Sequence, residues 1–246
     1  MSFLARVPAL WGGDDTKVWH AMRFFVAPAT LWLAPSYGYG VERIPETGGL
    51  LLAANHFSGI DHPLIGVFVP RPVYFMAKAE LFEIPVFGEL LDWTGTFPVR
   101  RGEVDRDALR TARTVMREGR ILALHVEGTR QRLGYPGPLQ LGGLSLAILD
   151  DVPVVPCAVD TFRWSPTNRK RCAVVFGEPI SLAGVGRGRG GSERAGEIVG
   201  AEIVRLWRLA IGAVHDGFPP VLPDGALRAG PTPPGWRPTR DPAAVV

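Results

Sequence analysis

Lysine and cysteine are scarce in this chain of 246 residues. Its 27 cationic residues include only three lysines, Lys17, Lys78 and Lys170, so almost all of its positive charge is arginine. Arginine forks suit phosphate groups, although a compositional bias of the source genome explains the excess equally well. The arginines are scattered and no aromatic platform is interleaved with them, which disfavours nucleic acid as a partner.

The two cysteines, Cys157 and Cys172, both lie in apolar, strand-like segments. We interpret them as buried thiols rather than as a disulfide or a metal pair, which favours a reducing, cytosolic setting. The N-terminus also lacks a charged region followed directly by an apolar core, so a cleaved signal peptide is not expected.

Charge is absent from residues 24–41, a run of eighteen residues. That length is at the lower limit for a membrane span, but Pro28, Pro35, Gly38 and Gly40 interrupt it. We interpret the segment as a helix lying in a membrane interface; a helix packed on the protein's own core and a full span are the alternatives. The side chains expected to enter the membrane are Phe24, Phe25, Val26, Leu31, Trp32 and Leu33, with Tyr37 and Tyr39 at headgroup level.

Strand and helix patterns alternate through most of residues 50–180, and the apolar fraction of 46% supports a substantial core. This alternation predicts an α/β fold with a mixed, partly parallel central sheet flanked by helices. Strands are expected at residues 50–54, 73–77, 95–99, 121–124, 152–159 and 172–176, and helices at 63–69, 104–118 and 141–149. A flexible linker at 184–192 and a long helix through Val199, Ile203, Leu206, Ala210 and Val214 are expected to follow.

We expect three parts. Residues 1–45 form an N-terminal membrane-associating helical segment, and residues 46–215 form the α/β domain. Residues 216–246 form a C-terminal tail with eight prolines.

A histidine and an aspartate stand five positions apart after the first buried strand. On one continuous helix His56 and Asp61 would lie about 140° apart, so they meet only if the backbone turns between them. Ser58 and Gly59 supply that turn, and Asp61 is a good N-cap for the next helix. A carboxylate on one imidazole nitrogen leaves the other free to take a proton. We predict a catalytic pair in hydrogen-bond reach, with His56 as general base; a turn histidine before an N-cap aspartate is the plainer alternative.

A second polar group, Glu127-Gly128-Thr129-Arg130, follows the strand expected at residues 121–124. It places a carboxylate, a flexible glycine, a hydroxyl and a guanidinium at the end of a strand, where ligands bind in α/β sheets. Arg100 and Arg101 directly follow the strand expected at 95–99, and they are either an anion site or a solvated pair.

Two other readings of the sequence remain open. Gly143-Leu144-Ser145-Leu146-Ala147 approaches the nucleophile elbow of a serine hydrolase, with Asp160 and His215 following in suitable order. Alanine replaces that motif's second glycine, however, and residues 140–143 are a poor strand. The other reading is a membrane-binding module without catalytic activity. No metal is expected, because His56, Asp61, His62 and His125 match no strong zinc template.

Four sequence blocks stand in a fixed order and span most of residues 51–180. They are His56 to Asp61 in an Asn-His-x-Ser-x-x-Asp setting, the segment from Lys78 to Arg101, Glu127-Gly128-Thr129-Arg130, and Val152-Pro153-Val154-Val155-Pro156, with Gly177-Glu178-Pro179-Ile180 following. In this order and at these separations, the blocks resemble the 1-acyl-glycerol-3-phosphate acyltransferase family of glycerolipid acyltransferases, with its histidine-four-residues-aspartate motif.

The resemblance implies an O-acyltransferase in which His56 deprotonates a lysolipid hydroxyl, Asp61 orients His56, and the alkoxide attacks an acyl thioester. The acyl donor would be acyl-CoA or acyl carrier protein, and the first acceptor 1-acyl-glycerol-3-phosphate, giving phosphatidic acid. By the same resemblance, Arg101, Glu127, Gly128, Thr129 and Arg130 would bind the acceptor's glycerol phosphate. No bound cofactor is implied, and the protein would lie at the cytoplasmic side of the membrane as a peripheral or monotopic protein.

This sequence departs from the family pattern at four positions. Val126 stands where proline is usual, and His125 stands where an aromatic residue such as phenylalanine is common. Arg100 replaces a frequent acidic residue, and Gln140 replaces a frequent lysine. Because these positions neighbour the expected phosphate site, another lysophospholipid, a glycolipid or an amino-acid lipid remains open as acceptor.

Overall fold

A single mixed sheet organises the structure, a computed structural model that describes residues 15–100, 102 and 104–215. Within this part of the chain, seven strands lie in the order β1-β7-β6-β2-β5-β3-β4. They are β1 (Ser36–Tyr39), β2 (Leu50–Ala54), β3 (Val73–Lys78), β4 (Thr96–Val99), β5 (Ile121–His125), β6 (Val154–Asp160) and β7 (Cys172–Phe176). Only β6 and β7 pair antiparallel; the other neighbours are parallel, which confirms the predicted mixed α/β fold.

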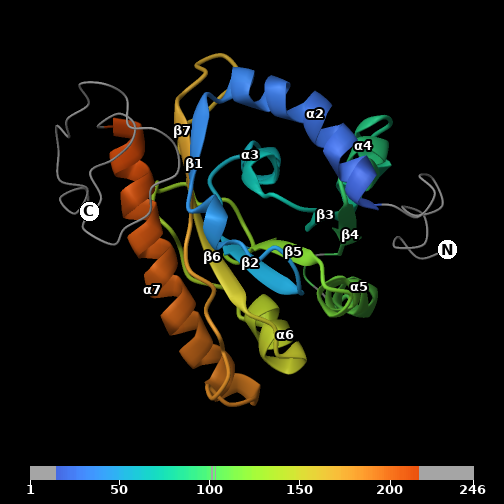
Figure 1. The fold of residues 1–246 in the computed structure, drawn as a ribbon, viewed down its shortest axis with the longest axis vertical. Helices are drawn as coiled ribbons and strands as arrows, with labels where there is room; N and C mark the ends of the chain where they lie inside the picture. The colour runs from blue at the N-terminus through green and yellow to red at the C-terminus, as the bar shows by residue number, and fades with distance from the viewer. Residues whose placement is uncertain (1–14, 101, 103, 216–246) are drawn as a thin grey trace.

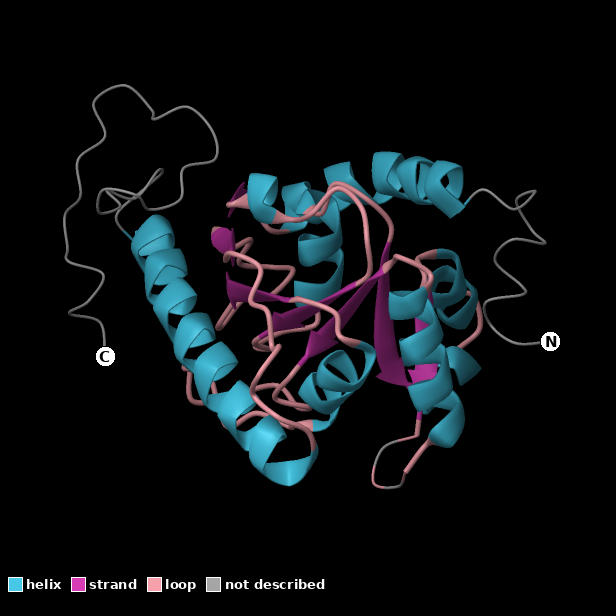
Figure 2. Cartoon of the chain, turned by 60° about the horizontal axis from the view of Figure 1, so that its bottom comes forward, coloured by secondary structure: helices cyan, strands magenta, loops and turns pink. Residues whose placement is uncertain are grey.

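Helices cover both faces of the sheet (Figures 1 and 2). The long helices are α2 (Asp15–Leu33), α5 (Arg106–Arg117) and α7 (Gly188–His215). Shorter ones are α3 (Asp61–Phe68), α4 (Phe87–Trp93) and α6 (Gly142–Asp150), with 3₁₀ turns η1 (Val41–Arg43) and η2 (Ala79–Glu83). One core lies between the sheet and α3, and a second lies between the sheet and α5, α6 and α7.

Strand β2 shows why the sheet is buried on both faces. Leu50, Leu52 and Ala54 belong to the core beneath α3, while Leu51 and Ala53 belong to the core beneath α5 and α6. Successive strand side chains point to opposite faces, so an uninterrupted apolar run is what a central parallel strand requires. The run that predicted this strand therefore also places it in the middle of the sheet.

The structure differs from the sequence prediction at one edge of the sheet and at the start of the last helix. Residues 36–39, which the expected division assigns to the N-terminal helical segment, form β1 in register with β7. Gly38 in this strand fits against the Phe68 ring, where a Cβ atom would lie 2.5 Å from a ring carbon. Helix α7 begins at Gly188, so the linker expected at 184–192 ends earlier than predicted.

Helix α2 accommodates Pro28 in its interior and ends at Leu33. It packs against α3, and its Trp19 and Leu31 contact the main core. Within the described residues, no helix combines the length and the apolar character that crossing a membrane requires. The N-terminal residues 1–14, Arg101 and the tail at 216–246 lie outside the described residues.

Candidate active site

The site lies where three adjacent parallel strands end. Strands β6, β2 and β5 are neighbours in the sheet, and Ala54 of β2 pairs with His125 of β5. Their carboxyl ends therefore lead to the same edge, where β2 continues into Asn55 and His56 and β6 continues into Thr161. Ligand sites of parallel α/β sheets lie at this edge.

His56 and Asp61 meet across the turn between β2 and α3. His56 Nδ1 lies 2.7 Å from Asp61 Oδ2, which confirms the predicted hydrogen-bond contact. The backbone N–H groups of Phe57 and Ser58 donate to the same oxygen at 2.8 and 3.0 Å. Ile60 rather than Asp61 occupies the N-cap of α3, because the Asp61 carboxylate turns back to bind the preceding loop.

Asp61 is fully buried, yet its charge is well compensated. Its Oδ1 accepts hydrogen bonds from Ser58 Oγ at 2.9 Å and from Thr161 Oγ1 at 2.5 Å. Burial alone would raise the pKa of Asp61, but the hydrogen bonds from His56 and Thr161 and the nearby imidazoles lower it to about 2. An ionised Asp61 holds the proton on His56 Nδ1 and leaves His56 Nε2 with its lone pair.

Two buried polar side chains hold the loop that carries His56. Asn55 clamps it to β6, with Asn55 Nδ2 donating to the Val159 carbonyl at 3.0 Å and Val159 N donating to Asn55 Oδ1 at 2.8 Å. Glu127 accepts the backbone N–H groups of His56 and Gly137, both at 2.6 Å. Burial raises the pKa of Glu127 to about 7, although the two N–H bonds lower it. Glu127 thus holds His56 by its backbone N–H, and Asn55 fixes the residue before it to β6.

A cavity of about 1340 Å³ opens beside His56. Part of its wall is cationic and polar, with Thr129, Arg130, Arg132 and Arg163. The rest includes apolar side chains of α2, β3 and α4, such as Met22, Val26, Tyr74, Leu91 and Trp93. Such a cavity suits a ligand that carries both an anionic group and a long apolar chain.

The predicted substrate-binding residues fall into three groups. Thr129 and Arg130 line the cavity with His56. Glu127 and Gly128 are not among the residues that line the cavity. Glu127 accepts hydrogen bonds from backbone amides. Gly128 forms a turn with φ +70, and a Cβ atom at this position would lie 3.0 Å from Gln140 Cγ. Arg101 lies outside the described residues, so its predicted role stays a prediction.

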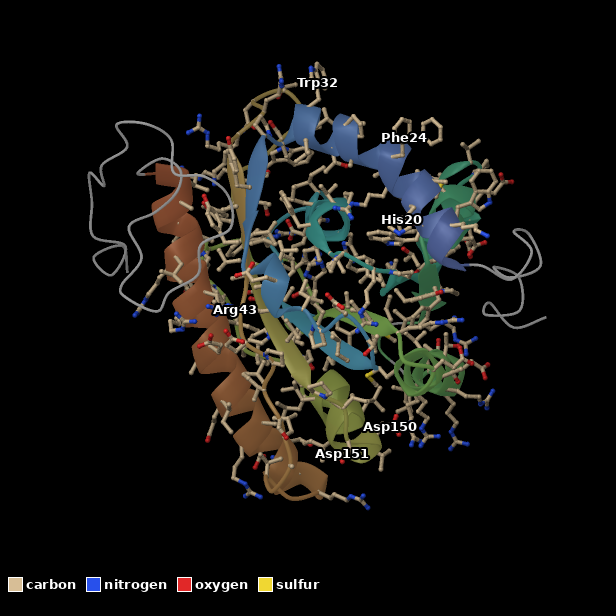
Figure 3. The ribbon with its side chains drawn as sticks, in the orientation of Figure 1. His20, Phe24, Trp32, Arg43, Asp150 and Asp151 are labelled. Atoms are coloured by element: carbon tan, nitrogen blue, oxygen red, sulfur yellow. The ribbon has the colours of Figure 1, made fainter. Side chains whose placement is uncertain are left out.

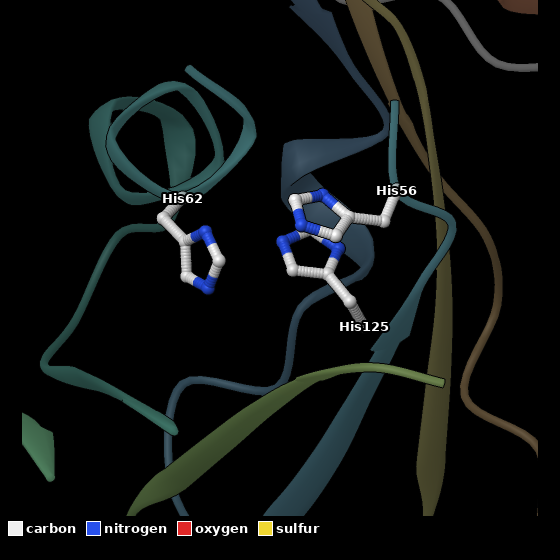
Figure 4. A group of neighbouring side chains, drawn as sticks. All are labelled: His56, His62 and His125. Atoms are coloured by element: carbon white, nitrogen blue, oxygen red, sulfur yellow. The ribbon is translucent and has the colours of Figure 1, made fainter. Parts of the chain in front are cut away.

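Three histidine rings lie together at the site (Figure 4). The rings of His56 and His125 are stacked, with centroids 4.0 Å apart and an interplanar angle of 13°, and His62 lies 4.4 Å from His125. Burial and the neighbouring His62 and His56 rings hold the pKa of His125 well below its usual value. The spacing of these residues in the sequence matched no zinc template, yet the fold brings their ring nitrogens within 4.8 Å of one another.

Ser145 does not occupy a nucleophile elbow. It lies inside α6, which follows a loop rather than a strand. Its Oγ bonds to the Leu141 carbonyl at 2.9 Å and to Ser192 Oγ at 2.7 Å. The strand–turn–helix geometry that exposes a hydrolase serine is therefore not formed.

Sequence reasoning missed Thr161 and the histidine cluster. Thr161 reaches Asp61 from 100 positions away, so no local motif reveals it. One signal was available: Thr161 lies two positions after the end of the strand expected at 152–159, and residues after parallel strands gather at one edge. His62 and His125 likewise become neighbours only once α3 and β5 are placed together.

The fold and the site define a mixed α/β protein whose aspartate-bound histidine faces a cavity for a large, partly apolar ligand. A protein-family model described as Acyltransferase matches residues 38–160, which is half of the chain. The chain belongs to the acyltransferase family.

Relatives of known name agree with this assignment. A 1-acyl-sn-glycerol-3-phosphate acyltransferase of Bacillus subtilis is 28% identical over 152 residues, covering 59% of this chain and 73% of the relative. The enzyme of that name in Escherichia coli is 31% identical over 137 residues, covering 52% of this chain and 56% of the relative.

A solved structure has a similar fold. The crystal structure of the 1-acyl-sn-glycerophosphate acyltransferase of Thermotoga maritima matches 76% of this chain and 77% of its own. The TM-score is 0.63 at 24% sequence identity, which supports the fold.

Proposed function

We propose that this protein transfers a fatty acyl group from acyl-CoA or acyl carrier protein to the hydroxyl of a lysolipid. The acceptor that we favour is 1-acyl-glycerol-3-phosphate, and the product is then phosphatidic acid. The observation that carries the proposal is the His56–Asp61 contact of 2.7 Å at the wall of a cavity of about 1340 Å³.

In the proposed reaction His56 is the general base. Its Nε2 takes the proton of the acceptor hydroxyl while the oxygen attacks the carbonyl carbon of the thioester. The carbon–sulfur bond then breaks, and the leaving thiolate recovers the proton from His56. Asp61 keeps the imidazole in the required tautomer and stabilises the imidazolium between these steps, and general-base catalysis of this kind contributes about 10²- to 10⁴-fold in rate.

The cavity wall supports a lipid phosphate as the acceptor's headgroup. Arg130, Arg132 and Arg163 line it, and arginine forks bind phosphate oxygens in pairs. The names of the curated relatives support the same acceptor. Arg101 and Thr129 are proposed to contact the headgroup, while Glu127 and Gly128 shape the loop behind it.

Other acceptors remain within the proposal because the site carries unusual residues. The ring of His125 stacks on that of His56, the proposed general base, and Val126 is the next residue in the chain after His125. The backbone N–H of Gln140 donates to the Val126 carbonyl at 2.6 Å. A changed headgroup site fits another lysophospholipid, a glycolipid or an amino-acid lipid, and an acceptor panel separates these substrates.

We also propose that the protein works at the cytoplasmic side of a membrane, as a peripheral or monotopic protein. Three aromatic side chains of α2 are largely exposed: Phe24 at 74%, Phe25 at 73% and Trp32 at 61%. Phe24 and Trp32 project outward from the helix (Figure 3). Exposed aromatics on one helix are typical of an interfacial contact.

The deciding experiment incubates the purified chain with a panel of lysolipids and each thioester donor, and detects products by mass spectrometry. We expect transfer to 1-acyl-glycerol-3-phosphate, with His56→Ala lowering the rate at least about a hundredfold. Ser145→Ala is the matched control and keeps most of the rate, whereas a serine hydrolase would lose it. Absence of transfer to every acceptor, or an undiminished rate in His56→Ala, would contradict the proposal, and the former would favour a module without catalytic activity.

A further inference from the structure

The three histidines of the site come from separate elements. His56 follows β2, His62 lies in the first turn of α3, and His125 is the last residue of β5. One ring nitrogen of each lies within 4.8 Å of the others. In Figure 4 the rings of His56 and His125 both extend toward His62.

Two of these rings have one nitrogen fixed and the other available. His56 Nδ1 is bound to the Asp61 carboxylate at 2.7 Å, and His125 Nδ1 lies 2.7 Å from the Asn55 carbonyl. Because a carbonyl oxygen only accepts hydrogen bonds, His125 Nδ1 carries the proton and His125 Nε2 carries a lone pair. That Nε2 has no solvent contact and no hydrogen-bond partner. A buried acceptor without a partner is costly and calls for an explanation.

We propose that His56, His62 and His125 form a binding site for a divalent transition-metal ion of the zinc class, and that metal bound there blocks acyl transfer. The hydrogen bonds at Nδ1 of His56 and His125 match this role, since histidines that bind metals donate their other N–H to a carboxylate or a backbone carbonyl. Three imidazoles suit Zn²⁺ and similar ions. With Zn–N bonds of about 2.0–2.1 Å, tetrahedral ligands lie about 3.4 Å apart, so nitrogens that lie within 4.8 Å of one another need to close by about 1.4 Å at most. The rings of His56 and His125, which are stacked with an interplanar angle of 13°, must also turn relative to each other so that both lone pairs point at one ion.

The site shares an atom with the proposed reaction, and the inhibitory part of this inference therefore rests on the proposed function. The lone pair of His56 Nε2 cannot hold a metal ion and accept a proton at the same time. His56 and His62 both line the cavity, which supplies an entry path and leaves the remaining coordination position open to it. Metal and the acceptor hydroxyl then compete for the same place.

Binding is tested with the untagged full chain after treatment with a chelator. The probe is Co²⁺ alone, whose visible absorption reports tetrahedral nitrogen ligation, followed by displacement with Zn²⁺. We expect one ion per chain, and at least about tenfold weaker binding in His125→Phe and in His62→Asn. His20→Asn is the matched control, because exposed His20 lies on α2 outside the cluster, and it binds like the wild type. Thermal unfolding of each variant verifies its fold.

Inhibition is tested by measuring the acyl-transfer rate against free Zn²⁺, normalised to each variant's own rate without metal. We expect the wild-type rate to fall as the site fills, and the inhibition midpoint of His125→Phe to rise at least about tenfold. The proposal is overturned if Co²⁺ does not bind saturably, if both variants bind like the wild type, or if full occupancy leaves the rate unchanged. If the chain transfers no acyl group even without metal, that result contradicts only the proposed function. The metal site is still tested, because the Co²⁺ absorption titration measures binding without acyl transfer.

Discussion

The buried carboxylate of Asp61 holds together the histidine, the loop and the strand end that form the site. Its two oxygens accept hydrogen bonds from the His56 ring, two backbone amides and two hydroxyls. Removing the side chain would therefore disturb the loop as well as the imidazole, and a change to alanine would not separate the two effects. The charge is better tested by a substitution that keeps the shape.

Asp61→Asn is that substitution. An asparagine keeps one oxygen for the ring and backbone N–H groups, and its amide can donate to the Ser58 and Thr161 hydroxyls, which also accept. We expect the fold to persist while the rate falls about 10²- to 10⁴-fold, because the neutral amide no longer stabilises an imidazolium. Steady-state kinetics measures the rate and circular dichroism the fold. A folded variant with the wild-type rate would show that the Asp61 charge does not serve catalysis.

Helix α5 shows how one capping side chain sets where a helix begins. Asp105 is its N-cap, and Asp105 Oδ1 accepts the backbone N–H groups of Asp107 and Ala108 at 3.2 and 3.1 Å. Asp105 Oδ2 accepts the N–H of Arg100 at 3.0 Å, which ties the end of β4 to the start of the helix. The backbone N–H groups of Arg100 and Ala108 contribute most to lowering the pKa of Asp105.

Asp105→Ala is expected to lower the free energy of unfolding by about 0.5–2 kcal/mol at pH 7. Because the folded pKa is lowered, the stabilisation by Asp105 is complete above the pKa of unfolded aspartate, about 3.9, and is lost as pH falls through the folded value. The difference between the two proteins therefore shrinks in acid. Urea unfolding at pH 7 and near pH 3 measures it. Asp105→Asn is the control, since asparagine is also a good N-cap, and a loss in Asp105→Asn as large as that in Asp105→Ala would contradict a capping role.

Elements with a strong local pattern could be predicted from the sequence, and those that depend on distant partners could not. The run at residues 50–54 and the periodic pattern of residues 104–118 correspond to β2 and α5. Strand β1 was missed because it is short, contains Gly38 and is stabilised by pairing with β7. The His56–Asp61 contact was predictable because only a turn separates the two residues, whereas Thr161 and the histidine cluster depend on how β6, α3 and β5 are arranged.

The cavity beside His56 and the exposed aromatic face share helix α2. Trp19, Met22 and Val26 of this helix line the cavity, while Phe24, Phe25 and Trp32 are exposed. Arg169 lies 4.5 Å from the Trp32 ring centroid, which adds a cation to the same face. A lipid acceptor held in a membrane under this face would have a short path to His56.

Phe24→Ser combined with Phe25→Ser tests that face. Burying a phenylalanine contributes about 1.5–3 kcal/mol at most, so we expect the double variant to bind vesicles at least about tenfold more weakly. Co-sedimentation with phosphatidylcholine vesicles containing an anionic lipid measures binding. Leu149→Ser combined with Ile198→Ser is the matched control, because these exposed apolar residues lie on α6 and α7, on the other face of the sheet. Unchanged vesicle binding by the Phe24/Phe25 variant would show that these α2 side chains are not the membrane contact, and equal losses in both double variants would show that the binding is not specific to the α2 face.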